Sequence, residues 1–153
     1  MFIATTDPTD PYVTDDDQPR TALSDLATAL TDTVEGYAVM ADKAVPDVQP
    51  VLERFLALHR AHMDRLRALI DEQGGDPTNA GSMLGTVHKV LAHTRDTLGR
   101  LDDRTHDIIL RTEARVEDRY QTARDALDEH PVIQSVLAAQ HAALREHVNA
   151  LKY

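Results

Sequence analysis

The sequence predicts an all-α protein in which four long helices pack into a bundle. Apolar residues recur at spacings of three and four along four long stretches, as on the buried face of a helix. Ala and Leu abound, aromatic residues make up only 4% of the chain, and Trp is missing. This composition is typical of closely packed helices and not of a sheet. Proline and glycine residues separate the stretches.

The chain has 153 residues, which is about the size of one domain with a single core. Residues 1–20 contain five Asp and three Pro and little that could be buried. We therefore expect an acidic, disordered N-terminal arm over residues 1–20. Residues 21–153 are expected to form the helical bundle.

The first helix is expected to begin near Thr21 or Ser24, because either side chain can cap free N–H groups. Pro46 and Pro50 bracket the turn to the second helix. Asp47 is the candidate cap of that second helix.

The second helix should run to about Glu72, where residues 74–77, Gly-Gly-Asp-Pro, end it. A shorter helix is expected over residues 82–99. A third long helix should follow at about Asp103, and the last one should begin at Pro131 and run to the end of the chain.

A weak internal repeat suggests how the helices are connected. Shifting the chain by 82 positions aligns the first two long helices with the last two, with their turns at the same place. The linker between these hairpins holds a helix of about 17 residues, which would span about 25 Å, close to the length of the bundle. A crossover of this length is the ferritin-like connection between the second and third long helices.

Two histidines occupy positions where a helix bundle normally places apolar core residues. The buried stripe expected for the second helix is Val48, Leu52, Phe55, His59, His62, Leu66 and Leu69. The pattern therefore places His59 and His62 in the centre of the bundle. His88, His93, His106 and His130 are interpreted as solvated or linker residues.

The composition excludes several classes of function. The net charge of −10 argues against binding to nucleic acid or to an anionic membrane surface. There is no cysteine, so disulfides, thiolate zinc sites and iron–sulfur clusters are excluded. The chain lacks a membrane-spanning apolar run and a secretory signal at its start, so we expect a cytoplasmic protein. No phosphate-binding loop and no catalytic triad can be argued, and no catalytic residue is assigned.

A family resemblance rests on two groups of residues. They are Asp32, Glu35, Gly36 and Tyr37 in the first helix, and Gly74, Gly75, Asp76, Pro77, Gly81, Ser82, Gly85 and His88 in the crossover. With these residues the chain resembles, over about residues 22–151, a bacterial family of ferritin-like four-helix-bundle proteins, a domain of unknown function. The resemblance implies a ferritin-like fold and no particular activity.

The wider ferritin-like superfamily raises the question of a metal site. Its di-iron members use a Glu on the first and third helices and Glu-x-x-His on the second and fourth. Here the corresponding positions hold Val34 on the first helix, His59-x-x-His62 on the second and Glu113 on the third. The fourth helix lacks the motif. A standard di-iron oxidase site is therefore not expected.

Two interpretations of the central polar residues remain open. In one, they bind a transition metal such as Fe or Zn, with His59, His62, Glu113 and His147 as ligands and Gln140, Glu117 and His141 as second-rank candidates. In the other, the histidines are core residues that need only hydrogen-bond partners. Tyr37, Tyr120, Gln140, Thr31 and Thr33 could supply these.

The leading functional prediction is a non-catalytic helical-bundle protein with a structural or stress-associated interaction role. We expect self-association as a homodimer, through apolar side chains off the centre of their stripes: Leu56, Leu58, Met63 and Leu110. The alternative is a metal-binding ferritin-like protein with an incomplete, His-rich site. A third possibility is a small-ligand pocket lined by Tyr37, His59 and Tyr120.

Overall fold

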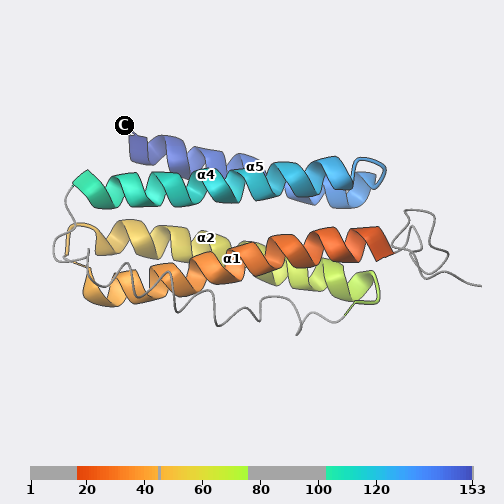
Figure 1. Ribbon diagram of the computed structural model, residues 1–153, viewed down its shortest axis with the longest axis horizontal. Helices are drawn as coiled ribbons and strands as arrows, with labels where there is room; N and C mark the ends of the chain where they lie inside the picture. Colours follow the sequence, from red (N-terminus) through yellow and green to blue (C-terminus); the bar gives the residue numbers. More distant parts are fainter. Residues whose placement is uncertain (1–16, 45, 76–102, 153) are drawn as a thin grey trace, which may run out of the picture.

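Four long helices form a bundle, which confirms the predicted all-α class (Figure 1). The computed structural model of the protein describes residues 17–44, 46–75 and 103–152. Its helices are α1 (Asp17–Lys43), α2 (Gln49–Glu72), α4 (Asp103–Ala126) and α5 (Pro131–Lys152). None of the helices in these residues is long and apolar enough to cross a membrane.

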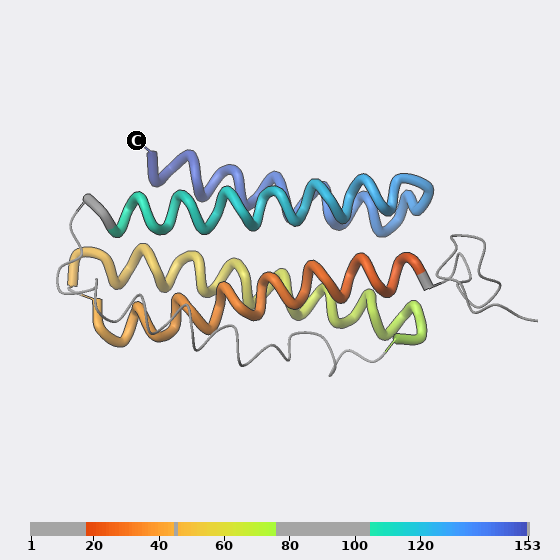
Figure 2. The backbone as a smooth tube through the Cα atoms, in the orientation of Figure 1, coloured from red at the N-terminus to blue at the C-terminus, as the bar shows by residue number. Residues whose placement is uncertain are grey.

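The helices form two antiparallel hairpins, α1–α2 and α4–α5, which pack along their length (Figure 2). Helices α2 and α4 run in the same direction, so α2 ends at the opposite end of the bundle from the start of α4 (Figure 1). A connection between opposite ends is what the crossover argument predicted. The helix predicted over residues 82–99 lies outside the described residues. Helix α1 packs against α2 and α4, whereas α5 packs against α4 and, less extensively, α2.

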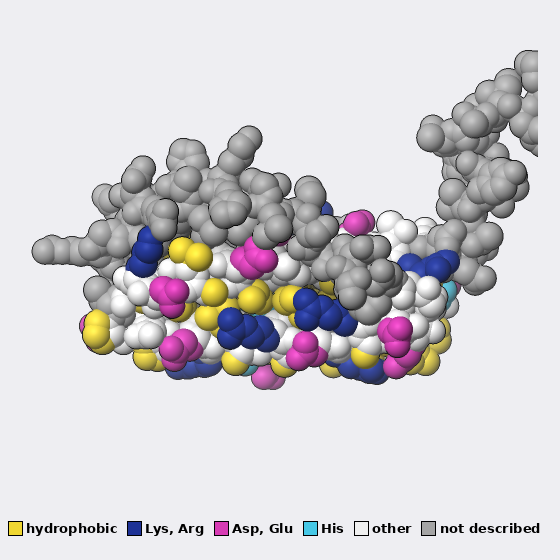
Figure 3. All heavy atoms as spheres, turned by 90° about the horizontal axis from the view of Figure 1, so that it is seen from below, with side chains coloured by type: hydrophobic (Ala, Val, Ile, Leu, Met, Phe, Trp, Pro, Cys, Tyr) yellow, Lys and Arg dark blue, Asp and Glu magenta, His cyan; other side chains and the backbone are white. Residues whose placement is uncertain are grey.

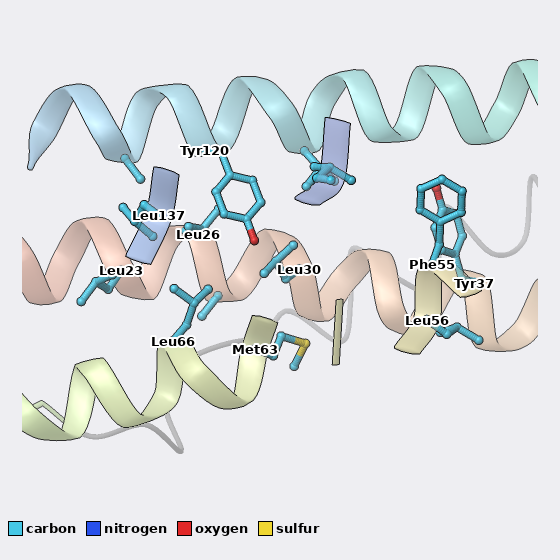
Figure 4. Packing of buried hydrophobic residues seen from close by; sticks show 14 of the residues in the cluster. Leu23, Leu26, Leu30, Tyr37, Phe55, Leu56, Met63, Leu66, Tyr120 and Leu137 are labelled. Carbon is cyan, nitrogen blue, oxygen red and sulfur yellow. The ribbon is translucent and has the colours of Figure 1, made fainter. Parts of the chain in front are cut away.

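Every helix contributes its apolar stripe to one core (Figure 4). Full burial of each such side chain stabilises the fold by roughly 1.5–3 kcal/mol. Tyr120 projects from α4 toward the middle of the bundle, and Tyr37 lies beside Phe55 further along (Figure 4). The leucine and isoleucine side chains that are at most 1% exposed are Leu23, Leu26, Leu30, Leu52, Leu66, Leu69, Ile70, Ile109, Leu127, Leu137 and Leu144.

The start of α1 differs from the prediction. The helix begins at Asp17, so the last four residues of the predicted arm are helical, and neither Thr21 nor Ser24 is at its start. Pro19 is buried in the first turn, where a proline removes no helical hydrogen bond. Residues 1–16 lie outside the described residues.

The start of α2 also differs from the prediction in its cap. Val48 is the capping residue and makes no side-chain cap bond, so Asp47 is not the cap. Val48 is buried in the core, whereas Asp47 is exposed. The apolar contact of Val48 and the proline in the first turn therefore define this end in place of a polar cap.

The end of α2 lies at Glu72, as predicted. Gly74 has a φ of +77°, which a residue with a side chain rarely adopts. This turn lets the N–H of Gly75 donate to the carbonyl of Ile70 at 2.9 Å. A Cβ atom on Gly75 would lie only 2.8 Å from Cγ2 of Ile70, so the close return of the chain also requires a glycine there.

Candidate functional site

His59 and His62 both lie inside the bundle, which confirms the predicted orientation of α2. The exposed fraction is 0% for His59 and 9% for His62. Because buried polar atoms are costly without partners, the contacts of these two rings define the polar centre of the protein.

Tyr37, His59 and Glu113 form the first of two buried hydrogen-bonded groups, which we call the Glu113 group. It joins α1, α2 and α4. The Tyr37 hydroxyl donates to Oε1 of Glu113 at 2.6 Å. Nε2 of His59 lies 3.0 Å from Oε1 and 3.1 Å from Oε2 of the same carboxylate. Glu113 is 0% exposed, so the carboxylate is solvated by these two side chains and not by bulk water.

The protonation of the Glu113 group follows from its geometry. Burial, the charge of Glu113 and the hydrogen bond to it raise the pKa of Tyr37 well above its usual value, so its hydroxyl remains a donor. Nε2 of His59 must carry a proton to donate to a carboxylate oxygen. The other ring nitrogen, Nδ1 of His59, is buried and has no hydrogen-bond partner.

His62, Tyr120 and Gln140 form the second group, the Tyr120 group, which joins α2, α4 and α5. The Tyr120 hydroxyl donates to Oε1 of Gln140 at 3.0 Å and lies 3.0 Å from Nδ1 of His62. Since this single hydroxyl proton points to Gln140, Nδ1 of His62 must be the donor to Tyr120. The Gln140 amide in turn donates to the carbonyl of His62 at 3.2 Å.

The Tyr120 group is electrically neutral near pH 7. Burial, with further contributions from His59 and His147, lowers the pKa of His62 from 6.5 to about 4. Burial, followed by the charge of Glu113, raises the pKa of Tyr120. Both side chains are therefore uncharged donors and acceptors over the physiological range.

The second-rank candidates His141 and Glu117 lie beside these groups and not within them. His141 stacks on the Tyr120 ring at 5.7 Å between centroids, and its Nδ1 accepts from the Arg124 guanidinium at 3.2 Å. Burial, then Arg145 and Arg124, lowers the pKa of His141. Nε2 of His141 is buried without a partner. Glu117 lies 3.9 Å from Arg145 in a partly exposed ion pair.

His147 lies further toward the end of the bundle, as its sequence position predicted. Its Nδ1 donates to the carbonyl of Ala143 at 3.0 Å, and its ring meets Phe55 edge-on at 6.0 Å. Next to it is a cavity of about 200 Å³. This cavity lies away from the predicted pocket lined by Tyr37, His59 and Tyr120. It is lined by Val51, Arg54, Phe55, His106, His147, Ala150 and Leu151.

The structure brings together only part of the predicted metal-ligand set. His59 contacts Glu113, whereas His62 is bonded to Tyr120 and His147 to a backbone carbonyl. Over the described ranges, no three His, Asp or Glu side chains are grouped so that they could hold one ion. Metal binding by the predicted set stays a prediction.

The hydrogen-bond partners expected from the sequence are confirmed in part. Tyr37, Tyr120 and Gln140 all bond within the two groups. Thr31 and Thr33 do not contribute, because each hydroxyl donates to a backbone carbonyl four residues earlier in α1.

Some polar positions were not proposed from the sequence as functional residues. Arg54 beside the cavity is one, and His106, interpreted as a solvated residue, is exposed but lines the same cavity. Oδ1 of Asp32 is buried without a partner, and burial, then Glu35, raises the pKa of Asp32. No periodic signal distinguishes these positions from ordinary surface residues, because each depends on which neighbouring helix lies opposite.

Comparison with known proteins identifies a family. The family described as Domain of unknown function (DUF2383) matches residues 18–129, which is most of the helical part of the chain. The chain matches no curated protein and no solved structure.

Proposed function

The chain belongs to the DUF2383 family, and we propose that it is a non-catalytic helical-bundle protein of the cytoplasm that acts through self-association. One observation carries this proposal. The carboxylate of Glu113, the hydroxyls of Tyr37 and Tyr120 and the amide of Gln140 are all used in hydrogen bonds within the chain. A catalytic site needs such groups within reach of a substrate, and these are at most 6% exposed.

The arrangement of the helices supports a ferritin-like relationship within this proposal. Parallel α2 and α4, flanked by antiparallel hairpin partners, match the order of a bundle with one long crossover (Figure 2). The two buried hydrogen-bonded groups would then serve to fix which helix faces which, because a shifted register would leave their polar atoms unpaired.

Fewer residues remain candidates for the self-association surface than the sequence suggested. Leu56 and Met63 are buried in the core of the single chain and cannot contact a second copy. Leu58 and Leu110 pack only partly against the core, which leaves them as candidates. On the face drawn in Figure 3, hydrophobic side chains form a broken strip along the middle, with acidic and basic side chains around it.

Sedimentation velocity over a range of protein concentrations tests the proposal. We expect a dimer that Leu58→Ser or Leu110→Ser weakens at least about tenfold, since burial of a leucine contributes roughly 1.5–3 kcal/mol. Val132→Ser is the matched control. Val132 is also apolar and is 73% exposed, but it lies at the start of α5, at the opposite end of the bundle from the starts of α2 and α4. A chain that stays monomeric at all concentrations would contradict self-association.

The unpartnered Nδ1 of His59 supports a second candidate function, which is metal binding. Histidines that ligate metals commonly donate their other ring N–H to a carboxylate, and His59 does this with Glu113. In this candidate Nδ1 of His59 would be the ligand atom, and Glu113 would hold the ring in place. No other ligand among the described residues completes a set of three.

Metal analysis of untagged protein tests the second candidate. Co-purified Fe or Zn, or a rise in melting temperature on adding Zn²⁺ or Fe²⁺ that His59→Gln abolishes, would support it. An apo protein whose melting temperature neither ion changes would rule it out.

A further inference from the structure

The cavity at the end of the bundle, which we call the end cavity, combines an apolar floor with basic side chains. It lies between α2, the start of α4 and the last turns of α5. From its lining we propose that the end cavity binds a small organic carboxylate with an apolar body, such as an aromatic or short branched-chain acid.

The floor of the end cavity is apolar. Phe55 is 2% exposed and meets the His147 ring edge-on, so the two rings form a rigid corner. Val51 and Leu151 are partly buried beside them. A ligand ring or branched chain placed here would remove apolar surface from water on both sides.

The rim of the end cavity is basic. Arg54 is exposed, and its guanidinium has no ion-pair partner in the part of the chain that the structure describes. A guanidinium presents paired N–H donors that match the two oxygens of a carboxylate. The side chain is therefore free to bind an anion, although the chain as a whole carries a net charge of −10.

Two histidines add directional groups to the same rim. Nδ1 of His147 donates to the carbonyl of Ala143, so Nε2 is the ring atom left for a ligand. His106 lies across the cavity on the first turn of α4. Helices α2 and α4 begin at this end of the bundle, whereas α1 and α5 end there, so the helix dipoles give no net preference for an anion (Figure 1). The preference for an anion therefore depends on the side chains.

The size of the end cavity limits the ligand. Pockets for drug-sized molecules have volumes of roughly 300–1,000 Å³. The end cavity has about 200 Å³, which suits one ring or a short branched chain. A nucleotide or a peptide would not fit, so the acid group and its apolar body must both be small.

Titration of the full-length protein with benzoate, followed by amide chemical shifts, tests this inference. We expect saturable shifts at residues such as Val51, Arg54 and Leu151. Acetate carries the charge without the apolar body, and benzyl alcohol carries the ring without the charge. Both should bind at least about tenfold more weakly. Benzyl alcohol lacks the hydrogen bonds to a charged group, and acetate lacks the apolar surface that the cavity would bury.

Two matched variants decide whether the end cavity is the site. Arg54→Ala should weaken benzoate binding about tenfold or more, whereas Arg60→Ala, at another exposed position of α2, should leave it unchanged. Both positions are exposed, so neither variant should unfold the bundle. The inference is overturned by non-saturable shifts, by equal binding of benzoate and benzyl alcohol, or by equal affinity of the Arg54→Ala variant for benzoate.

Discussion

The Glu113 group and the Tyr120 group both pair polar side chains inside the core, but one contains a carboxylate and the other contains only neutral groups. Each joins three of the four helices through a central side chain of α4 that contacts α2. At the centre of one is a carboxylate that is 0% exposed; at the centre of the other is a tyrosine hydroxyl. The carboxylate depends entirely on its two protein donors. The second group contains only neutral atoms, and His62 and Gln140 in it are 9% and 6% exposed.

The difference in charge indicates which of these buried polar contacts contributes most to the stability of the fold. Loss of a partner from a buried charge is costly, because neither water nor a neighbour can replace it. Loss of a neutral hydrogen bond is milder, because it leaves no unpaired charge in the core. The two groups should therefore respond unequally to equivalent substitutions.

The largest effect is expected for Glu113→Ala. The substitution leaves the Tyr37 hydroxyl and Nε2 of His59 without their shared acceptor and opens a cavity. We expect a loss of about 3–5 kcal/mol in the free energy of unfolding, measured by urea denaturation. Glu117→Ala is the control, since its partly exposed ion pair with Arg145 should contribute at most about 1 kcal/mol. Similar losses of stability in Glu113→Ala and Glu117→Ala would contradict the special role of the buried carboxylate.

The second largest effect is expected on the pH dependence of stability, which His62 of the Tyr120 group should cause. The pKa of His62 is 6.5 in the unfolded chain and about 4 in the folded protein. The unfolded state therefore binds the proton first as the pH falls. This contribution to stability is fully present above about pH 6.5 and is lost as the pH falls toward about 4, with a limit of about 3 kcal/mol.

Urea denaturation at pH 7 and pH 5 measures this dependence. The His62→Gln variant should lose less stability between the two pH values than the wild-type protein does. His106→Gln, at an exposed histidine, should behave like the wild type. If His62→Gln lost as much stability between pH 7 and pH 5 as the wild-type protein, the pKa of His62 would be the same in the folded and unfolded states.

A smaller loss is expected for Tyr37→Phe. This variant removes one hydrogen bond to the buried carboxylate and keeps the contact of Glu113 with His59. Because a hydrogen bond to a charged group contributes about 1.5–3 kcal/mol, we expect a loss of about 2 kcal/mol by urea denaturation. A loss as large as that of Glu113→Ala would show that Tyr37, and not His59, is the main support of the carboxylate.

The smallest loss is expected for Tyr120→Phe. Its hydroxyl makes two neutral hydrogen bonds, so the substitution leaves no unpaired charge at His62 or Gln140. We expect the free energy of unfolding, measured by urea denaturation, to fall by about 1–2 kcal/mol. Gln121→Ala, which removes an exposed contact to Asp125, should change stability by less than about 0.5 kcal/mol. A greater loss in Tyr120→Phe than in Tyr37→Phe would reverse the order of the two groups.

Much of the fold was predictable because helical periodicity and helix-ending residues are local signals. Apolar spacing placed the stripe of α2, and the two glycines after Glu72 placed the end of that helix. The start of α2 was not predictable in this way. Its capping residue Val48 makes an apolar tertiary contact, whereas the sequence offered the polar Asp47. Burial of an apolar side chain in the core outweighed the local preference for a polar cap.

The sequence by itself determined that α2 would place His59 and His62 in the core, because the period of a helix decides which residues share a face. Only the tertiary structure decided their partners. His59 meets a carboxylate and His62 a tyrosine, although both come from the same face of α2 and both partners come from α4. The depth and rotation at which two helices pack set such pairings, and these depend on the whole core and not on the spacing within either helix.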